Sequence, residues 1–288
     1  VEVESTRAFP TIFQIKYPIT GTPLVSIVIP NKDHVEDLRR CIQSIVNKST
    51  WSNYEIVVVE NNSKEQSIFD YYKELEALPQ VQVVTYEGEF NYSRINNFGV
   101  SKTRGEYLLL LNNDTEVITP DWMEQLLMYA QRKDVGAAGA KLYYGDDTIQ
   151  HAGVVIGLGA HRSAGHTHYK MPRQHLGYMG RLCYAQDVTA VTGACLMVSR
   201  AAYDQVGGLD ESFTISLNDV DFCLKLREAG YLNIFTPFAE LYHYESKSRG
   251  LEDTPEKVAR FNREIASFEK HWPEILRDGD HYYNLNLT

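Results

Sequence analysis

The sequence predicts an α/β fold built on a mainly parallel sheet, and three observations carry this prediction. Short apolar runs alternate with stretches of helical periodicity through the first half of the chain. The runs are apolar at successive positions, as expected of strands that are buried on both faces of a sheet. Polar residues follow the runs directly, at the strand ends where open sheets of this kind bind ligands. Strands that alternate with helices also imply right-handed crossovers and a parallel order.

Length and composition bound the class of protein. The chain has 288 residues, 43% of them apolar, which is ample for one large domain with a real core. A formal charge of -10 argues against a nucleic-acid partner. No apolar run approaches the ~20 residues of a membrane span, so we expect a cytoplasmic protein that at most contacts the inner membrane surface. The cysteines show no paired spacing and are expected to be reduced thiols: Cys41, Cys183, Cys195 and Cys223.

The first 23 residues are predicted to be a lead-in segment before a single domain at 24–288. They contain Pro10, Pro18, Gly21 and Pro23 and show little periodicity. The chain starts at Val1 with neither a methionine nor a signal-peptide pattern, from which we expect a module of a longer protein.

The first half of the domain, about 24–118, is predicted to hold four strands and three helices. The first helix shows its apolar face in the spacing of Val35, Leu38, Ile42 and Ile45. In chain order the elements are a strand at 24–30, that helix, a strand at 54–60, a helix at about 65–78, a strand at 81–86, a helix at 93–102 and a strand at 107–111.

The second half, about 119–250, is less regular. Thr119 and Pro120 predict a helix cap and first turn, with the helix running to about Arg132. Apolar runs predict strands at 153–159 and 187–199. Helices are predicted from Asn218 to a stop at Gly230, and from Thr254 to about 272.

A loop at about 159–178 separates those two strands and is rich in histidine. The spacing of its histidines fits no metal-ligand pattern, so we predict a polar, mobile flap on the acceptor side of the site rather than a metal centre. The four are His161, His166, His168 and His175.

Seven segments occur in an order that resembles family 2 glycosyltransferases with the GT-A fold. They are "VSIVIPNKD", "EIVVVENNS", "SRINNFG", "LLLLNNDTEV", "VTGACLMVSR", "LNDVDFCLKLREAGY" and "LYHYESKSRG", and they span nearly everything from Leu24 to Gly250. The chain is especially similar to enzymes that build bacterial surface polysaccharides such as rhamnose-containing chains and O-antigens. The resemblance implies inverting, metal-dependent transfer of a sugar from a nucleotide-diphosphate donor to a saccharide or lipid-linked acceptor.

The resemblance implies a metal site at the end of the fourth strand. Asp114 matches the last acid of the family's DXD motif, and a hard oxygen ligand beside a diphosphate suits Mn²⁺ or Mg²⁺. An Asp that only accepts backbone N–H bonds in a turn is the alternative. Asn112 and Asn113 replace acids of the motif, which lowers the negative charge of the site. His243 matches a position that often supplies a further ligand, although a lone histidine is more often structural.

The resemblance also implies a donor-binding set. Glu60 matches an acid that contacts the nucleotide, whose base is expected to be uracil or thymine. Arg94 and Asn97 match the segment that approaches the ribose and diphosphate, and Arg249 would close over the diphosphate. The alternatives are that the polar residues at the strand ends lie in solvated loops and that Arg94 is a surface charge on an exposed helix face. The full predicted donor set is Pro30, Asn31, Asp33, Glu60, Asn62, Arg94, Asn97, Asn112, Asn113 and Arg249.

Two acids are implied for catalysis. Asp219 and Asp221 match the family's paired acidic motif, with Asn218 in the place of its first acid. Asp219 would be the general base, and Asp221 would support it or orient the acceptor. The structural alternative is a helix start, in which Asn218 caps the helix and the acids meet its dipole.

The sequence also allows comparison with two other classes of function. A catalytically silent sugar-nucleotide-binding or scaffolding module of a larger polysaccharide-synthesising protein is the main alternative, and the intact Asp219 and Asp221 argue against it. A dinucleotide-dependent oxidoreductase is disfavoured, because no glycine-rich fingerprint follows the first strand.

Overall fold

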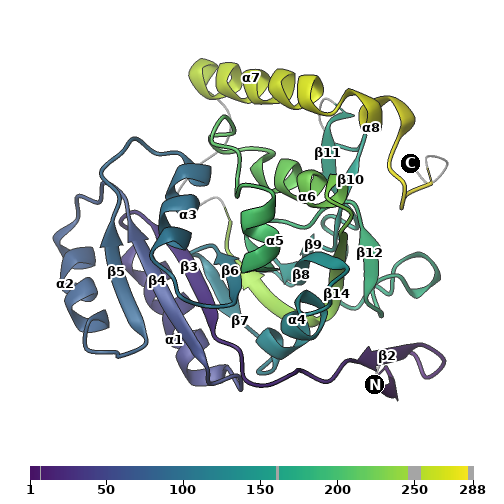
Figure 1. The fold of residues 1–288 in the computed structure, drawn as a ribbon, viewed down its shortest axis with the longest axis horizontal. Coiled ribbons are helices and arrows are strands. Elements are labelled where there is room, and N and C mark those ends of the chain that lie inside the picture. Colours follow the sequence, from purple (N-terminus) through teal and green to yellow (C-terminus); the bar gives the residue numbers. More distant parts are fainter. Residues whose placement is uncertain (7, 160–161, 246–253, 285–288) are drawn as a thin grey trace.

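The computed structural model describes residues 1–6, 8–159, 162–245 and 254–284, and most of these pack on one ten-stranded sheet (Figure 1). The main path of the sheet runs in the order β12 (Gln186–Val188), β14 (Leu232–His243), β8 (Val135–Tyr143), β13 (Cys195–Ser199), β6 (Tyr107–Leu111), β3 (Val25–Asn31), β4 (Tyr54–Glu60) and β5 (Val81–Thr85). Off this path, β7 (Thr115–Val117) pairs with β14 and β9 (Ile149–His151) pairs with β8.

The two halves of the sheet differ in strand direction. Strands β6, β3, β4 and β5 are parallel to one another. Strand β13 lies antiparallel between β6 and β8, whereas β14 runs parallel to β8. The predicted α/β class, with a parallel first half and a mixed second half, is confirmed.

Helices cover both faces of the sheet and bury two apolar cores. Helices α1 (Val35–Lys48), α2 (Gln66–Leu75) and α4 (Trp122–Ala130) pack into the core on one face. The other core contains residues of α3 (Tyr92–Ser101), α5 (Arg200–Gln205) and α6 (Asn218–Glu228). Helices α7 (Pro255–His271) and α8 (Pro273–Asp278) lie beyond α6 (Figure 1), and Phe268 anchors α7 in this second core.

The central strand β8 was not predicted, because its sequence lacks a strand signal. It reads "VGAAGAKLY", with no β-branched residue after Val135, yet all nine residues are buried. A Cβ at Gly139 would lie 2.5 Å from the Cβ of Val191, so close packing requires the glycine. Strand β8 therefore depends on neighbours that are distant in the sequence.

Other boundaries in the second half also differ from the prediction. The run at 187–199 forms two strands, β12 and β13, and the run at 153–159 gives only β10 (Val154–Ile156). Within the histidine-rich segment, β11 (Ala164–His166) pairs with β10, and Tyr178–Gly180 form the 3-10 helix η2, so part of this segment has regular secondary structure.

Three helix starts test the predicted caps. Thr254 caps α7, since its side chain accepts a hydrogen bond from the Lys257 amide. The cap of α4 is Asp121 rather than Thr119. Asn218 is the first residue of α6 and not its cap, which is Leu217 in the left-handed conformation with φ 63°. The sharp turn at Leu217 sets the direction in which α6 starts.

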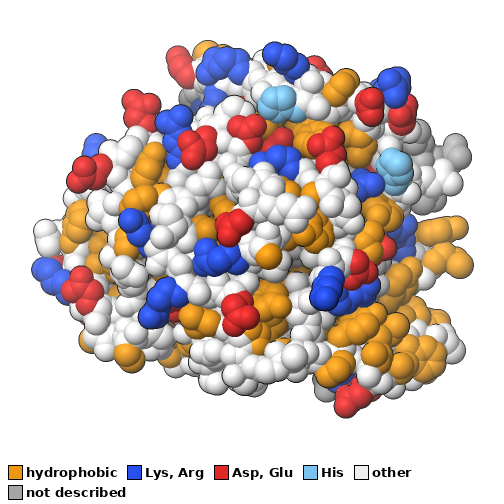
Figure 2. Space-filling model, viewed as in Figure 1, with side chains coloured by type: hydrophobic (Ala, Val, Ile, Leu, Met, Phe, Trp, Pro, Cys, Tyr) orange, Lys and Arg blue, Asp and Glu red, His pale blue; other side chains and the backbone are white. Residues whose placement is uncertain are grey.

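The first 23 residues contain an antiparallel hairpin of β1 (Glu2–Ser5) and β2 (Phe13–Lys16). Figure 2 shows apolar side chains gathered over this hairpin, at the lower right of the view. Its exposed apolar residues are Val1, Val3, Phe9, Phe13 and Ile15. Among the helices that the structure describes, none has the length and apolar character needed to cross a membrane.

Candidate active site

A polar cleft of about 170 Å³ lies where the ends of several elements meet. The end of β6, the turn before β13, the start of α6 and the end of β14 all contribute to it. Its lining residues are Tyr92, Asn112, Gln150, His166, Thr192, Gly193, Ala194, Ile215, Ser216, Leu217, Asn218, Asp219, His243 and Glu245. The cleft therefore joins three of the predicted site residues, Asn112, Asp219 and His243, from distant parts of the chain.

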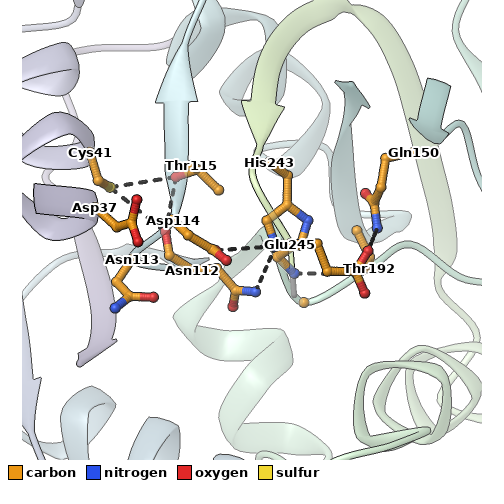
Figure 3. Close-up of polar contacts among 12 residues, drawn as sticks. Asp37, Cys41, Asn112, Asn113, Asp114, Thr115, Gln150, Thr192, His243 and Glu245 are labelled. Carbon is orange, nitrogen blue, oxygen red and sulfur yellow. Dashed lines mark hydrogen bonds and ion pairs between the residues drawn. The ribbon is translucent and has the colours of Figure 1, made fainter. Parts of the chain in front are cut away.

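The predicted metal ligands lie in contact at the edge of this cleft. Asp114, in the turn after β6, and His243, at the end of β14, are both buried. Asp114 Oδ1 lies 3.2 Å from His243 Nε2, and the Asn112 amide nitrogen lies 3.2 Å from the same ring nitrogen (Figure 3). The structure thus brings a carboxylate oxygen and an imidazole nitrogen together.

The hydrogen-bond chemistry of these three residues suits a divalent cation. The Tyr92 hydroxyl lies 3.3 Å from Asn112 Oδ1, which leaves the Asn112 N–H groups to face His243. If Asn112 donates to His243 Nε2, that nitrogen carries a lone pair and no proton. Nε2 then faces a carboxylate oxygen across 3.2 Å, and a cation bound between the two would take this lone pair in place of the Asn112 N–H. One oxygen and one nitrogen ligand form a donor set that suits Mn²⁺.

The predicted base, Asp219, is held rigidly at the start of α6. Its Oδ2 accepts a hydrogen bond of 2.8 Å from the Gly193 amide, and its Oδ1 accepts one of 2.9 Å from the Val220 amide. A Cβ at Gly193 would lie 3.1 Å from the Tyr92 hydroxyl oxygen, so the turn packs tightly against the cleft wall. The Asp219 side chain lines the cleft, and the amide donors fix its orientation there.

Asp221 lies outside the cleft, which does not support its predicted role beside the base. The Trp272 indole N–H donates a 2.9 Å hydrogen bond to Asp221 Oδ1, and only 2% of the Asp221 side chain is exposed. Burial raises the pKa of Asp221. Residues two positions apart on a helix do not share a face, so Asp219 and Asp221 point in different directions. Asp221 connects α6 to the C-terminal helices.

The donor-side cluster, which we define as Asn31, Asp33 and Glu60, gathers at the ends of β3 and β4 but bonds to the chain itself. Buried Glu60 accepts hydrogen bonds from the Ser63 amide at 2.6 Å, from the Ser63 hydroxyl at 2.5 Å and from the Tyr72 hydroxyl at 2.5 Å. Burial raises the pKa of Tyr72, and its bond to Glu60 adds to this effect.

Asp33 and Asn31 are used in a similar way. Asp33 Oδ1 accepts from the amides of Lys64 and Glu65 at 2.7 and 2.9 Å. Burial alone would raise the pKa of Asp33, but these backbone bonds bring it below its usual value. Asn31 donates to the Tyr72 hydroxyl and accepts from Asn113. Pro30 lies within β3 and is partly buried.

The remaining predicted donor residues have structural contacts or lie elsewhere. Asn97 bonds to the Leu209 backbone and to Tyr203, and so holds the turn after α5. Arg94 is exposed and pairs with Glu211 at 3.2 Å. Asn62 is exposed, adopts φ 60° and donates to the Gly88 carbonyl. Arg249 lies outside the described residues, as does His161.

Several cleft residues were not predicted. Tyr92 and Gly193 carry no sequence signal by themselves, because their roles depend on contact with Asn112 and Asp219. Glu245 lies two residues after His243 within a quoted motif, and that spacing on a strand end was a usable signal. Gln150 donates to Glu245 at 3.3 Å (Figure 3), but nothing in its own segment indicated this contact.

Comparisons with known proteins identify the family of the chain. The model of the family described as Glycosyl transferase family 2 matches residues 26–207. Protein y4gI of Sinorhizobium fredii is 48% identical over 97% of the chain, and O-antigen biosynthesis protein RfbC of Myxococcus xanthus is 35% identical over 99%. The crystal structure of GalNAc-T7 with UDP, GalNAc and Mn²⁺ superposes with a TM-score of 0.68 at 15% identity, covering 89% of this chain and 49% of that one.

The chain spans only part of those relatives, 31% of protein y4gI and 22% of RfbC. The family match covers more than half of the chain and includes the strand ends that carry Asp114. The structural likeness to GalNAc-T7 shows that the two share the GT-A fold. The chain therefore belongs to glycosyltransferase family 2.

Proposed function

We propose that the cleft transfers a sugar from a nucleotide-diphosphate donor to a hydroxyl of a saccharide or lipid-linked acceptor, with inversion at the anomeric carbon. The observation that carries the proposal is one cleft that presents the fixed Asp219 carboxylate and, at its edge, the Asp114 and His243 pair. Similarity to RfbC supports a place in bacterial surface polysaccharide synthesis.

Asp114 and His243 are the residues proposed to hold Mn²⁺ or Mg²⁺. A bound cation would neutralise the diphosphate and so favour its departure. The Asn112 amide fixes the His243 ring in the orientation that turns Nε2 toward Asp114. The UDP and Mn²⁺ in the GalNAc-T7 structure support the same kind of site on this fold.

Asp219 is proposed as the general base of a single displacement. Its carboxylate takes the proton of the acceptor hydroxyl while the hydroxyl oxygen bonds to the anomeric carbon. The bond from that carbon to the diphosphate breaks with its electron pair on the diphosphate oxygen. Attack from the opposite face inverts the configuration, and no covalent intermediate with the enzyme is needed.

The donor base is proposed to be uracil or thymine, on family resemblance. Glu60 lends this preference less support than its sequence position suggested, because three donors of the chain already bond to its carboxylate. The donor-side cluster is instead proposed to shape the loops that border the nucleotide.

The test is nucleotide binding combined with turnover. Calorimetric titration with UDP, dTDP and GDP, in Mn²⁺ and again in EDTA, should show metal-dependent binding that is tighter for the pyrimidine nucleotides. A hundredfold excess over the dissociation constant should stabilise the fold by about 2.7 kcal/mol. Hydrolysis of the bound nucleotide sugar without an acceptor would support the enzyme. Tight binding without turnover on any acceptor would favour the scaffolding module, and tighter binding of GDP would overturn the pyrimidine preference.

A further inference from the structure

Two histidines that the proposed mechanism does not use lie in direct contact beside the cleft. His151, in β9, is fully buried, and His166, in β11, lines the cleft. Their Nδ1 atoms are 2.9 Å apart, and the two rings meet edge to face with an interplanar angle of 88°. One of the two nitrogens must carry a proton for this contact to be a hydrogen bond.

The surroundings of His151 decide which nitrogen carries it. The amides of Gly153 and Thr192 both direct their N–H groups at His151 Nε2, each with an N to N distance of 3.4 Å. Two converging donors require Nε2 to be an acceptor without a proton. A neutral His151 is then protonated on Nδ1 and donates to His166 Nδ1. Burial lowers the pKa of both imidazoles, which favours the neutral forms.

The tautomer of His166 follows from that of His151. Because His166 Nδ1 accepts a hydrogen bond, a neutral His166 carries its proton on Nε2. Nε2 has no hydrogen-bond partner among the residues that the structure describes. The pair therefore maintains one N–H donor that the described part of the chain does not use.

His166 also separates two hollows. Besides the catalytic cleft, it lines a second cavity of about 490 Å³, a volume in the range of small-molecule sites. The cavity is lined by aromatic and apolar side chains together with hydrogen-bonding groups, a mixture that suits the two kinds of surface on a sugar ring. Among its lining residues are Leu158, Met171, Tyr178, Arg181, Gln186 and Tyr282.

We propose that His166 is a positioning residue for the acceptor, which is a saccharide of at least two units. His166 Nε2–H donates a hydrogen bond to the unit whose hydroxyl reacts in the cleft, and the next unit occupies the second cavity. The hydrogen bond from His151 Nδ1 keeps His166 in the tautomer that is protonated on Nε2. This inference rests on the proposed glycosyl transfer and adds the part of the acceptor that the second cavity recognises.

The first experiment observes the tautomer directly. A ¹H–¹⁵N spectrum of the whole chain labelled with ¹⁵N-histidine, assigned with His166→Gln and His151→Leu, should show His166 protonated on Nε2 and bare on Nδ1. A His166 that is protonated on Nδ1 in the wild type would overturn the proposal. In His151→Leu the fixed tautomer should be lost.

The second experiment measures acceptor binding with p-nitrophenyl monosaccharides, the matching p-nitrophenyl disaccharides and octyl glycosides, each added to protein loaded with Mn²⁺ and UDP. A disaccharide should bind more tightly than its monosaccharide, and His166→Phe should weaken that binding by about tenfold. Gln places an amide N–H near the position of Nε2, so His166→Gln should restore much of the affinity. The exposed His281→Phe serves as the matched control.

Each outcome bears on a separate claim. Unchanged disaccharide binding in His166→Phe, or a wild type that binds none of these glycosides, overturns the proposal. A gain in affinity only for octyl glycosides assigns the second cavity to an apolar chain and overturns the saccharide claim. UDP binding and donor hydrolysis are followed in the same samples. If the wild type neither binds UDP nor hydrolyses the donor, the proposed function fails. If it does both but the glycoside experiments are negative, only the proposed role of His166 is rejected.

Discussion

The donor-side cluster and the cleft occupy comparable places in the fold, yet their polar groups are used differently. Both lie at strand ends, the cluster after β3 and β4 and the cleft after β6 and β14. Glu60 accepts hydrogen bonds from the amide and hydroxyl of Ser63 in the loop that follows it and from the Tyr72 hydroxyl of α2. In the cleft, the Asp114 carboxylate faces the His243 imidazole at 3.2 Å, and Asp219 lines a polar hollow.

This difference shows that position at a strand end does not by itself make a carboxylate available to a ligand. A carboxylate has about four acceptor positions, and a neighbouring loop can occupy most of them. The loop after β4 donates to both acids, through Ser63 to Glu60 and through Lys64 and Glu65 to Asp33, so these acids stabilise that loop. The four predictions below test this contrast, from the largest expected effect to the smallest.

The largest effect is expected for Asp219→Asn. Loss of a positioned base should lower turnover by about 10²–10⁴-fold. Mn²⁺-dependent binding of UDP should change little, because Asp219 is not one of the proposed metal ligands. Steady-state transfer or donor hydrolysis, measured beside calorimetric binding, gives both quantities. Asp204→Asn, an exposed acid on α5, is the control, and wild-type turnover in Asp219→Asn would reject the base assignment.

Asp114→Asn should impair binding and turnover together. Without the carboxylate, the cation loses a charged oxygen ligand, and we expect Mn²⁺-dependent UDP binding to weaken by about tenfold or more. Titrations in Mn²⁺ and in EDTA separate this effect from a general loss of affinity. Glu116→Gln, two residues along in β7, is the matched control. If Asp114→Asn keeps its response to Mn²⁺, the ion binds elsewhere.

Glu60→Gln should act on stability more than on ligand binding. The amide places N–H groups against donors from Ser63 and Tyr72, and such a mismatch in a buried site costs about 1–3 kcal/mol of unfolding free energy. Chemical denaturation measures this cost. If Glu60→Gln keeps the stability of the wild type but loses much of its UDP affinity, Glu60 binds the ligand, and the donor-side cluster does not differ from the cleft in this respect.

The smallest effect is expected for Asp221→Asn, because Asn still accepts the Trp272 hydrogen bond. Burial raises the pKa of Asp221 in the folded state above its ordinary value of 3.8. The folded state therefore binds the Asp221 proton more tightly than the unfolded state. This contribution to the free energy of unfolding is fully present below about pH 3.8 and is lost as the pH rises through the folded-state pKa of Asp221.

Asp221→Asn should lack this loss of stability with rising pH. Its free energy of unfolding should stay within about 1 kcal/mol of the wild type at neutral pH. Unfolding free energies measured from acidic to neutral pH test this expectation. Asp204→Asn is the control, which should lose stability with rising pH as the wild type does. A loss of turnover comparable to that of Asp219→Asn would return Asp221 to the catalytic site.

Much of the fold was predictable because strong local patterns specify it. The apolar runs of β3, β4 and β6 and the spacing of Leu38, Ile42 and Ile45 in α1 predicted their elements correctly. The positions of Asp114, His243 and Asp219 followed from family motifs, and the structure places all three at or beside one cleft. The motifs implied a role at the site for both Asp219 and Asp221, but only the direction of the helix after Leu217 determines which acid faces the cleft.

The sequence by itself determined the alternation of strands and helices, the family, and the residue types available at each strand end, because these depend on local periodicity and ordered motifs. Only the tertiary structure decided that β8 is a strand, since Gly139 and its neighbours gain their conformation from packing against Val191 and not from propensity. It also decided which acids remain for a ligand. Glu60 is occupied by hydrogen bonds within the chain, whereas Asp219 lines a cleft. This difference depends on which donors from other segments lie near each carboxylate, and folding alone brings those segments together.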